Sequence, residues 1–515
     1  MKEKFASKKQ EWFMQRDVFF TALLIGVLTH GYMLFNKLPN VDDYVSMFHY
    51  GLGYPLGRWF LALMGNFMFR IDGVYSLPYL NGVFFLFTLA LSITIFLKPF
   101  PFHNKWVKRI FAALFVSFPT VTSTMGFMFT VPFYGLAILL MAIGFYLTVT
   151  YRYGFLISIL LMCCSLGIYQ AYWCLCAAFL LLFLIAACMN PDTKNKDFLV
   201  LCLKSFITLL LSVLVYLIIN NIMLKLQNIT LSDYQGVSQM GAFEFSQIPT
   251  ILGNAYSWFF RMLGDNYLYI TWYPIVRVVI GTGYFISLLL FVMACFQNRK
   301  NMFRVGALIL FTAILPLTIN SIYIMCNDAS TVHILMCYSV VLVFFAPFVY
   351  LHGVMAQCNQ RNILQYTKVA YLCCLVLVTF LYVRLANLYY FDLDLSYRET
   401  TGFMTTLSTR IQQTEGYTMD KPVYFHGLYP HASNRNIWEL RPVNQMHGTI
   451  DVDNVINSPL MRQNFFKVYL GHAFYEITDN NLITGLQDTI AQMPSYPDDG
   501  SIQIFDDIIV IKLSD

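Results

Sequence analysis

Repeated long apolar runs are the feature that most limits what this chain can fold into. Of its 515 residues, 58% are hydrophobic and only 12% are charged. A helix needs about 20 apolar residues to cross the roughly 30 Å of hydrocarbon in a bilayer, where only helices and closed barrels satisfy their own backbone. The sequence therefore predicts a polytopic α-helical membrane protein, whose partner is the lipid bilayer and not a nucleic acid.

The apolar runs predict about eleven transmembrane helices. The stretch 154–189 is too long for one ordinary span, so we divide it at the polar segment 165–170, and ten spans remain the alternative. The first run follows a basic stretch and lacks a small-residue cleavage site, which indicates a retained span. The expected spans are residues 17–36, 75–97, 109–122, 132–150, 154–168, 171–189, 199–220, 271–296, 305–325, 332–350 and 367–387.

Lysine and arginine fall in alternate loops, and this pattern predicts an orientation. Short loops rich in these residues stay in the cytoplasm. Basic residues occur in the N-terminal segment and in the loops near residues 98–109, 152, 194–204, 299–304 and 361–368. We therefore expect a cytoplasmic N-terminus, with residues 37–74, 221–270 and 388–515 outside the cytoplasmic membrane.

The last part of the chain has the composition of a different domain. Residues 388–515 hold 8 Lys and Arg against 16 Asp and Glu, and none of the 12 cysteines. We expect helices over 394–413 and 480–492, a strand over 422–426 and further strands over 502–513. The sequence thus divides into a transmembrane domain, residues 1–387, and a small extracytoplasmic α/β domain, residues 388–515.

Two adjacent carboxylates mark the first external loop, residues 37–74. Asp42 and Asp43 precede a stretch from Met47 to Met68 with an apolar stripe, which favours a helix lying along the membrane interface. A carboxylate before a helix is commonly a cap. The alternative is chemistry, because a carboxylate near the outer bilayer surface can meet both a lipid-borne phosphate and a hydrophilic acceptor.

Three segments of the chain resemble the Gtr-type glucosyltransferases, bacterial membrane enzymes that modify O-antigen and related surface glycans. The first segment is Asp42-Asp43-Tyr44 followed by Gly57-Arg58-Trp59. The second is Ser165-Leu166-Gly167-Ile168-Tyr169-Gln170-Ala171-Tyr172. The ending that contains Met493 to Ser501 also resembles the ending of the Gram-positive-type members.

The resemblance implies a GT-C type enzyme in the bacterial cytoplasmic membrane. Such an enzyme takes a hexose, typically glucose, from a polyprenyl-phosphate donor in the outer leaflet and places it on a cell-surface glycan acceptor. An inverting displacement needs one general base and no covalent sugar–enzyme intermediate. The second external loop, residues 120–131, has no acidic residue. We therefore expect no metal cofactor, although divalent metal use is an open alternative.

Each candidate residue has a role in this reaction and a simpler alternative. Asp42 or Asp43 would take the proton from the acceptor hydroxyl as general base. The Arg58 fork would bind the departing phosphate, whose charge grows in the transition state, but an interfacial arginine also binds ordinary lipid headgroups. Three further residues would contact the substrate: Tyr44, Tyr169 and Gln170. The alternative for the last two is a polar break between spans.

Two other classes of protein fit part of the sequence. A transporter or flippase for lipid-linked sugars would also need many spans and an outward-facing cavity, but such proteins often contain two similar halves, and no such pairing is visible. A receptor or scaffold that holds a partner with its tail would leave Asp42, Asp43 and Arg58 without a role. A membrane hexosyltransferase is therefore the leading prediction.

Overall fold

The computed structural model describes most of the chain. The described residues are 2–46, 48–102, 104–232, 245–326, 329–358, 361–429, 443, 452–478, 483, 485–505 and 507–515. Within them, only the backbone is described for residues 2–12, 245 and 361.

Two compact units make up the structure. The first, which we name the membrane unit, contains Met1–Asn36 and Phe48–Asn387, and the second, the tail unit, contains Lys37–Met47 and Leu388–Asp515. The segment with Asp42 and Asp43 thus packs with the C-terminal part of the chain, although it follows the first span in sequence. The functional division at residue 387 stays a prediction, because compactness alone assigns neither unit a role or a side of the membrane.

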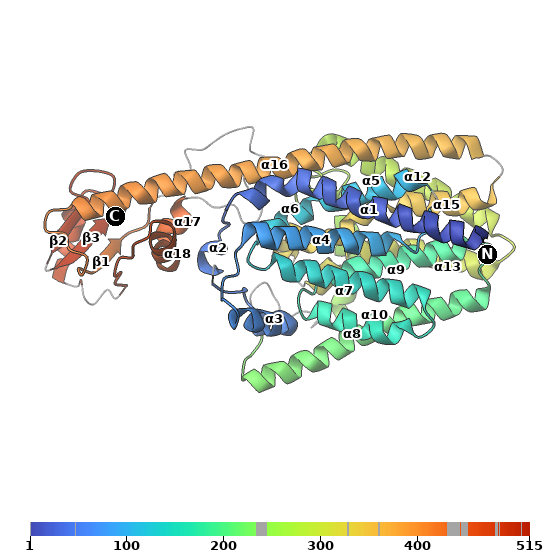
Figure 1. The fold of residues 1–515 in the computed structure, drawn as a ribbon, viewed down its shortest axis with the longest axis horizontal. Coiled ribbons are helices and arrows are strands. Elements are labelled where there is room, and N and C mark those ends of the chain that lie inside the picture. The colour runs from blue at the N-terminus through green and yellow to red at the C-terminus, as the bar shows by residue number, and fades with distance from the viewer. Residues whose placement is uncertain are drawn as a thin grey trace. The chain divides into compact units, whose positions relative to one another are not determined.

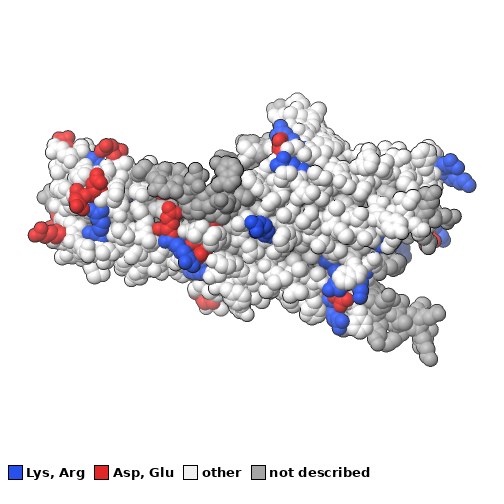
Figure 2. Space-filling model, turned by 90° about the horizontal axis from the view of Figure 1, so that it is seen from above, with Lys and Arg blue, Asp and Glu red and all other residues white. Residues whose placement is uncertain are grey.

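Among the described residues, nine helices are long and apolar enough to cross a membrane (Figure 1). Long stretches of the surface carry no charged side chain in Figure 2, and large apolar side chains such as Phe206 and Phe285 are exposed on the helices. The prediction of a polytopic helical membrane protein is confirmed. The nine are α1 (Lys2–Phe35), α4 (Pro78–Leu97), α7 (Val131–Thr150), α9 (Tyr172–Met189), α10 (Asn195–Gln227), α12 (Pro274–Gln297), α13 (Met302–Ile319), the segment Tyr338–Gln357 that includes α15 (Ala346–Gln357), and α16 (Arg361–Gln413).

Two of the eleven predicted spans correspond to helices that are too short to cross. Helices α5 (Lys105–Ser117) and α8 (Gly154–Leu166) have 13 residues each, and a helix of that length rises only about 20 Å. Proline explains the end of α5. Phe118 is extended, with φ −61° and ψ 140°, as the residue before a proline prefers, and Pro119 begins the separate helix α6 (Pro119–Met125).

Helix α9 lies at the centre of the membrane unit. It contacts α7, α8, α10, α13 and α15, and most of its side chains are buried. Around it, α4 packs against α1 and α7, α10 packs against α8, and α12 packs against α15. A helix buried on all sides needs no polar face, which is why α9 reads as a uniformly apolar run.

The helix predicted along the membrane interface is shorter than expected. The sequence predicts one helix from 47 to 68, whereas the structure has α2 (Asp43–Ser46), the 3₁₀ turn η1 (Tyr54–Leu56) and α3 (Trp59–Phe69). Gly51 and Gly57 take φ values of 88° and 70°, which L side chains rarely adopt and which interrupt a right-handed helix. Met47 lies outside the described residues.

The tail unit contains a three-stranded sheet in the order β1-β3-β2. β1 (Val423–His426) pairs in parallel with β3 (Ile508–Lys512), and β2 (Ile502–Phe505) pairs antiparallel to β3. The predicted strands are confirmed. The helix predicted over 480–492 is present as α19 (Gln487–Gln492), while 480–482 and 484 lie outside the described residues. The unit also contains the short helices α17 (Val452–Asn457) and α18 (Pro459–Asn464) and the π-helical segment Phe465–Tyr469.

A buried ion pair joins α18 to the loop that precedes α19. The side chains of Arg462 and Glu476 are 4% and 3% exposed, and the Arg462 Nε donates to Glu476 Oε2 at 3.1 Å. The guanidinium also lies 3.8 Å from the ring centroid of Phe425 on β1. Removing one partner of a buried pair leaves a charge without compensation, which costs several kcal/mol.

We therefore predict that Glu476→Gln destabilises the tail unit by about 3 kcal/mol. The measurement is the temperature at which a protease begins to cleave the tail unit of the full-length protein in detergent. That temperature should fall for Glu476→Gln and stay at the wild-type value for Glu415→Gln, because Glu415 is exposed. Equal temperatures for the two variants would contradict the role of the ion pair.

Candidate active site

The first candidate residues lie in the tail unit, where Asn40 precedes the short helix α2. The Asn40 Oδ1 accepts hydrogen bonds from the backbone N–H groups of Asp42 (2.8 Å) and Asp43 (3.0 Å). In return, the Asp43 carboxylate accepts one from the backbone N–H of Asn40 (3.1 Å). This reciprocal arrangement is a capping box. The cap residue is therefore Asn40, and Asp43 completes the box.

The two neighbouring carboxylates, which the sequence does not distinguish, differ in their exposure to solvent. Asp43 is 1% exposed, and its charge acts on Lys37 and Tyr389 in the same unit. Asp42 is exposed. Its backbone is held in place, because its C=O accepts from the N–H of Ser46 (2.7 Å). Of the two side chains, Asp42 is the one that a substrate in solvent can reach.

Tyr44 lies in the core of the tail unit. Its ring is 5.6 Å from that of Phe465 and 5.5 Å from that of Tyr469, and its C=O accepts from the Asn464 side chain at 2.7 Å. Burial, reinforced by the charges of its neighbours, raises the pKa of the phenol well above its usual range. The hydroxyl therefore keeps its proton. The structure gives Tyr44 packing contacts, and its role toward substrate stays a prediction.

The second group of candidates meets in the membrane unit. The segments Gly57-Arg58-Trp59 and 165–172 are far apart in sequence, yet the C=O of Gly167 accepts from the N–H of Phe60 at 2.9 Å. A Cβ on Gly167 would lie 2.6 Å from the Trp59 ring, so this close approach requires glycine. The start of α3 is thereby fixed to the turn between α8 and α9.

Arg58 lies over the ring of Tyr169, with its guanidinium carbon 5.1 Å from the ring centroid. Tyr169 stacks in turn on Tyr134, at 4.7 Å between centroids. Within the part of the chain that the structure describes, the buried Nε of Arg58 and the buried hydroxyl of Tyr169 have no hydrogen-bond partner. Because buried polar atoms in folded proteins are normally hydrogen-bonded, both atoms are candidates for bonds to a substrate.

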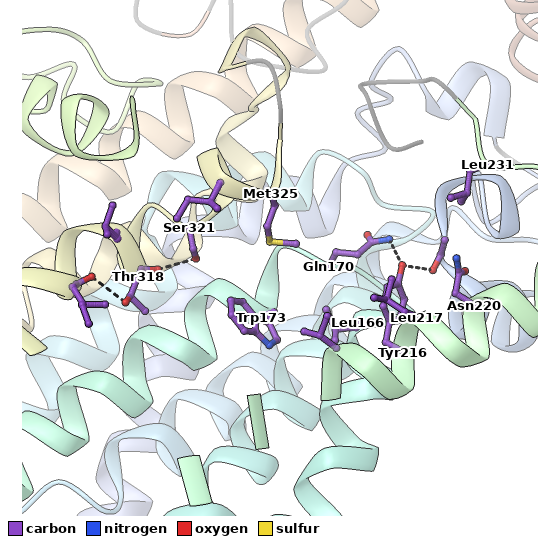
Figure 3. Close-up of a pocket in the computed structure, with 15 residues that line it drawn as sticks. Leu166, Gln170, Trp173, Tyr216, Leu217, Asn220, Leu231, Thr318, Ser321 and Met325 are labelled. Atoms are coloured by element: carbon purple, nitrogen blue, oxygen red, sulfur yellow. Dashed lines mark hydrogen bonds between the residues drawn. The ribbon is translucent and has the colours of Figure 1, made fainter. Parts of the chain in front are cut away.

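Gln170 connects this turn to the first loop and to α10 (Figure 3). Its Nε2 donates to the C=O of Leu56 (2.8 Å) and to the hydroxyl of Tyr216 (3.0 Å), and Tyr216 donates to the C=O of Gly57 (3.1 Å). Gly57 has φ 70°, and a Cβ there would lie 2.5 Å from the Tyr216 oxygen. The Gln170 amide nitrogen thus bonds to two groups of the protein itself, as expected of a residue that positions other parts of the site.

These residues border a pocket of about 540 Å³ in the membrane unit. Gln170 and Tyr216 lie beside one another in its wall (Figure 3), together with Gly57, which accepts from Tyr216. Much of the remaining described lining is apolar, from α8, α10 and α13. None of the described residues that line it is charged. The pocket therefore suits a ligand with a hydrogen-bonding end and an apolar body.

A metal site is not apparent in the described ranges. They contain no group of three or more His, Cys, Asp or Glu side chains that could hold a metal ion. The polar atoms beside the pocket are amide, hydroxyl and indole groups together with the Arg58 cation, and a guanidinium cannot bind a metal. Metal independence stays a prediction.

Several residues of the site are missing from the sequence-based candidates. Tyr216 and Asn220 are polar residues one helical turn apart in a long apolar span, a pattern that marks functional positions in membrane helices. The three-residue spacing of Asn40 and Asp43 matches a capping box, so this cap could also have been predicted from the sequence. Asp392 on α16 is 2% exposed, and its charge acts on Tyr389 as that of Asp43 does. The sequence around Asp392 contains no motif that would have identified it.

A known protein family matches the part of the chain that contains most of these candidate residues. A sequence model of the family described as glucosyl transferase GtrII matches residues 31–344, more than half of the chain. The match contains Asp42, Asp43, Arg58, Tyr169 and Gln170 and stops before the sheet of the tail unit. Searches of curated proteins and of solved structures returned no match. The predicted resemblance is thus confirmed over residues 31–344, while the resemblance of the ending stays a prediction, and the chain belongs to the GtrII family of membrane glucosyltransferases.

Proposed function

We propose that this GtrII glucosyltransferase takes glucose from a polyprenyl-phosphate donor at the outer side of the bacterial cytoplasmic membrane and transfers it, with inversion, to a cell-surface glycan. The observation that carries the donor assignment is the Arg58 cation, which directly follows a lining residue of a largely apolar pocket. A lipid-linked sugar phosphate combines these two chemistries. A nucleotide sugar lacks the apolar part.

Arg58 would act on the leaving group. As the acceptor oxygen attacks the anomeric carbon, the bond from that carbon to the phosphate oxygen breaks and its electron pair leaves with the phosphate. The charge on phosphate therefore grows toward the transition state, where a fixed cation stabilises it more than in the ground state. The stacking of Arg58 on Tyr169 holds the guanidinium in place while its edge remains able to bind phosphate oxygens.

Asp42 would be the general base. The attacking hydroxyl must lose its proton, and a carboxylate that takes it has to reach the acceptor. Asp42 is exposed, and the Asn40 side chain holds its backbone. Asp43 is buried and completes the capping box, which supports a structural role. The choice of Asp42 over Asp43 is thus a choice between an accessible and an enclosed carboxylate.

The remaining candidates divide between substrate contact and positioning. The buried hydroxyl of Tyr169, which has no partner among the described residues and lies next to Arg58, is suited to bond the sugar or its phosphate. Gln170 would act through Tyr216 and the first loop, since its amide nitrogen already bonds to both. We propose no metal for this reaction, because the Arg58 cation can neutralise the phosphate charge.

The proposed orientation places the N-terminus in the cytoplasm and residues 37–74, 221–270 and 388–515 outside. One contact supports this arrangement. The N–H of Ser232 donates to the C=O of Pro55 at 2.8 Å, so two loops that the orientation assigns to the same outer side meet. The donor pocket borders Gly57 and Leu231 in these loops, and would then face the leaflet that carries the donor.

The carboxylates give the first test. We predict that Asp42→Asn lowers kcat for transfer from polyprenyl-phosphate glucose to the glycan acceptor by about 100-fold or more, the typical contribution of a general base. Asp43→Asn should keep activity within several-fold, because an asparagine oxygen can still accept from the Asn40 N–H. The measurement is radiolabelled glucose transferred by purified protein at equal amounts of folded enzyme.

The two variants control each other, because they differ by one position and make the same chemical change. Loss of activity only in Asp43→Asn would assign the base to the buried carboxylate. Full activity in both variants would contradict a loop carboxylate as base, and would leave Asp43 with its place in the capping box and Asp42 without a part in the reaction.

Arg58 gives a second test. Arg58→Ala should lower kcat by about 100-fold or more, as expected when a group that stabilises transition-state charge is removed. Arg58→Lys should recover only part of the rate, because an ammonium keeps the charge and loses the fork. Arg70→Ala is the matched control, since Arg70 is an exposed arginine at the other end of α3. Unchanged kcat in Arg58→Ala would refute the phosphate role.

A further inference from the structure

The pocket beside Gly57 lies between two helices that face the lipid. Val213 and Leu217 of α10 and Ile314 and Leu317 of α13 contribute to its lining. The neighbouring side chains on the same helices, such as Leu214 and Ile309, are 43% and 52% exposed. Since exposed apolar side chains on membrane-spanning helices meet lipid tails, both walls of the pocket border the hydrocarbon region.

Helices α10 and α13 pack mainly against other helices, and the pocket lies between them. α10 packs mainly against α8, and α13 packs mainly against α9. The lining residues on each helix are spaced three and four apart, from Val213 to Asn220 on α10 and from Ile314 to Thr318 on α13, so each helix presents one continuous face to the pocket. An apolar chain can therefore enter sideways, between α10 and α13, without crossing water.

The wall of the pocket has hydrogen-bonding capacity that no described residue uses. Within the described residues, the Asn220 Oδ1 and the Trp173 Nε1 are buried and have no hydrogen-bond partner, and Asn220 is 5% exposed. Both residues line the pocket. One offers an acceptor and the other a donor. A buried polar atom left without a bond is costly, so these two atoms favour a ligand that donates to one and accepts from the other.

We propose that this pocket is the site at which the donor's isoprenoid chain enters from the bilayer, with its first isoprene units between α10 and α13 and its polar end at Asn220, Trp173 and Gly57. The occupant is the lipid-linked sugar and not a bulk phospholipid, because the polar end lies at Gly57, the residue before Arg58, and the Asn220 oxygen, which no described residue bonds, can accept from a sugar hydroxyl. This assignment rests on the proposed function, since it takes the donor of that reaction as its ligand.

The assignment predicts that the pocket sets the preference for long-chain donors. Leu217→Trp and Leu317→Trp fill the space between the helices, and overpacking of this kind displaces bound groups. The ratio of kcat/KM for a full-length polyprenyl-phosphate glucose to kcat/KM for a donor of two isoprene units should fall about tenfold in each variant. In Leu214→Trp, a neighbouring lipid-facing change on the same helix, the ratio should equal that of the wild type.

A labelling experiment on the wild-type protein covers the case in which the filled variants do not fold. A polyprenyl phosphate with a photoreactive group near the phosphate should label peptides of α10 and α13, and excess unlabelled polyprenyl phosphate should abolish the labelling. Competition by phosphatidylglycerol to the same extent would show a site for ordinary lipid and overturn the assignment, as would an unchanged donor ratio in both filled variants. Failure of the proposed function would look different, because the wild type would then transfer glucose from neither donor.

Discussion

The hydrogen bonds of the Gln170 side chain are the interaction on which the proposed site depends. They join the turn between α8 and α9 to the Leu56 carbonyl and to Tyr216 on α10. Each such bond contributes only about 1 kcal/mol net, but a buried partner left unbonded costs about 1–3 kcal/mol. Because Gly57 accepts from the same Tyr216 hydroxyl, the network fixes the backbone from which Arg58 projects. Arg58, its Tyr169 platform and the pocket therefore form one arrangement.

The neighbouring carboxylates show how local backbone chemistry can divide the roles of two identical side chains. Asn40 caps α2, and the capping box needs an acceptor three residues later, which Asp43 supplies. Asp42, the residue directly before Asp43, is left exposed. A paired Asp at this position thus combines a stable turn with an accessible carboxylate. The cost of burying the other carboxylate is offset by its hydrogen bond and by the nearby charge of Lys37.

Much of the fold could be predicted from sequence because burial in lipid is a local property of a run of residues. Nine predicted spans correspond to long apolar helices, whereas the runs around Pro119 and before Gly167 contain short ones, since a proline or a turn divides them. Contacts between segments that are far apart in the chain could not be predicted in the same way. The resemblance assigns Arg58 and Tyr169 to one reaction but does not predict that they touch. The packing of Lys37–Met47 with the C-terminal part depends on side-chain contacts, such as Tyr44 on Phe465, that no local pattern encodes. Tyr216 and Asn220 were missed because their neighbours on α10 are apolar.

The central claim is that glucose passes from a lipid-linked phosphate directly to a glycan. The most direct measurement reconstitutes the wild-type protein in liposomes with polyprenyl-phosphate glucose or with a nucleotide-linked glucose, adds the host's surface glycan, and determines by NMR the anomeric configuration of the transferred sugar. The account predicts transfer from the lipid-linked donor alone, with the configuration inverted. Transfer from the nucleotide sugar, retention of configuration, or movement of the lipid donor across the bilayer without any transfer would contradict it.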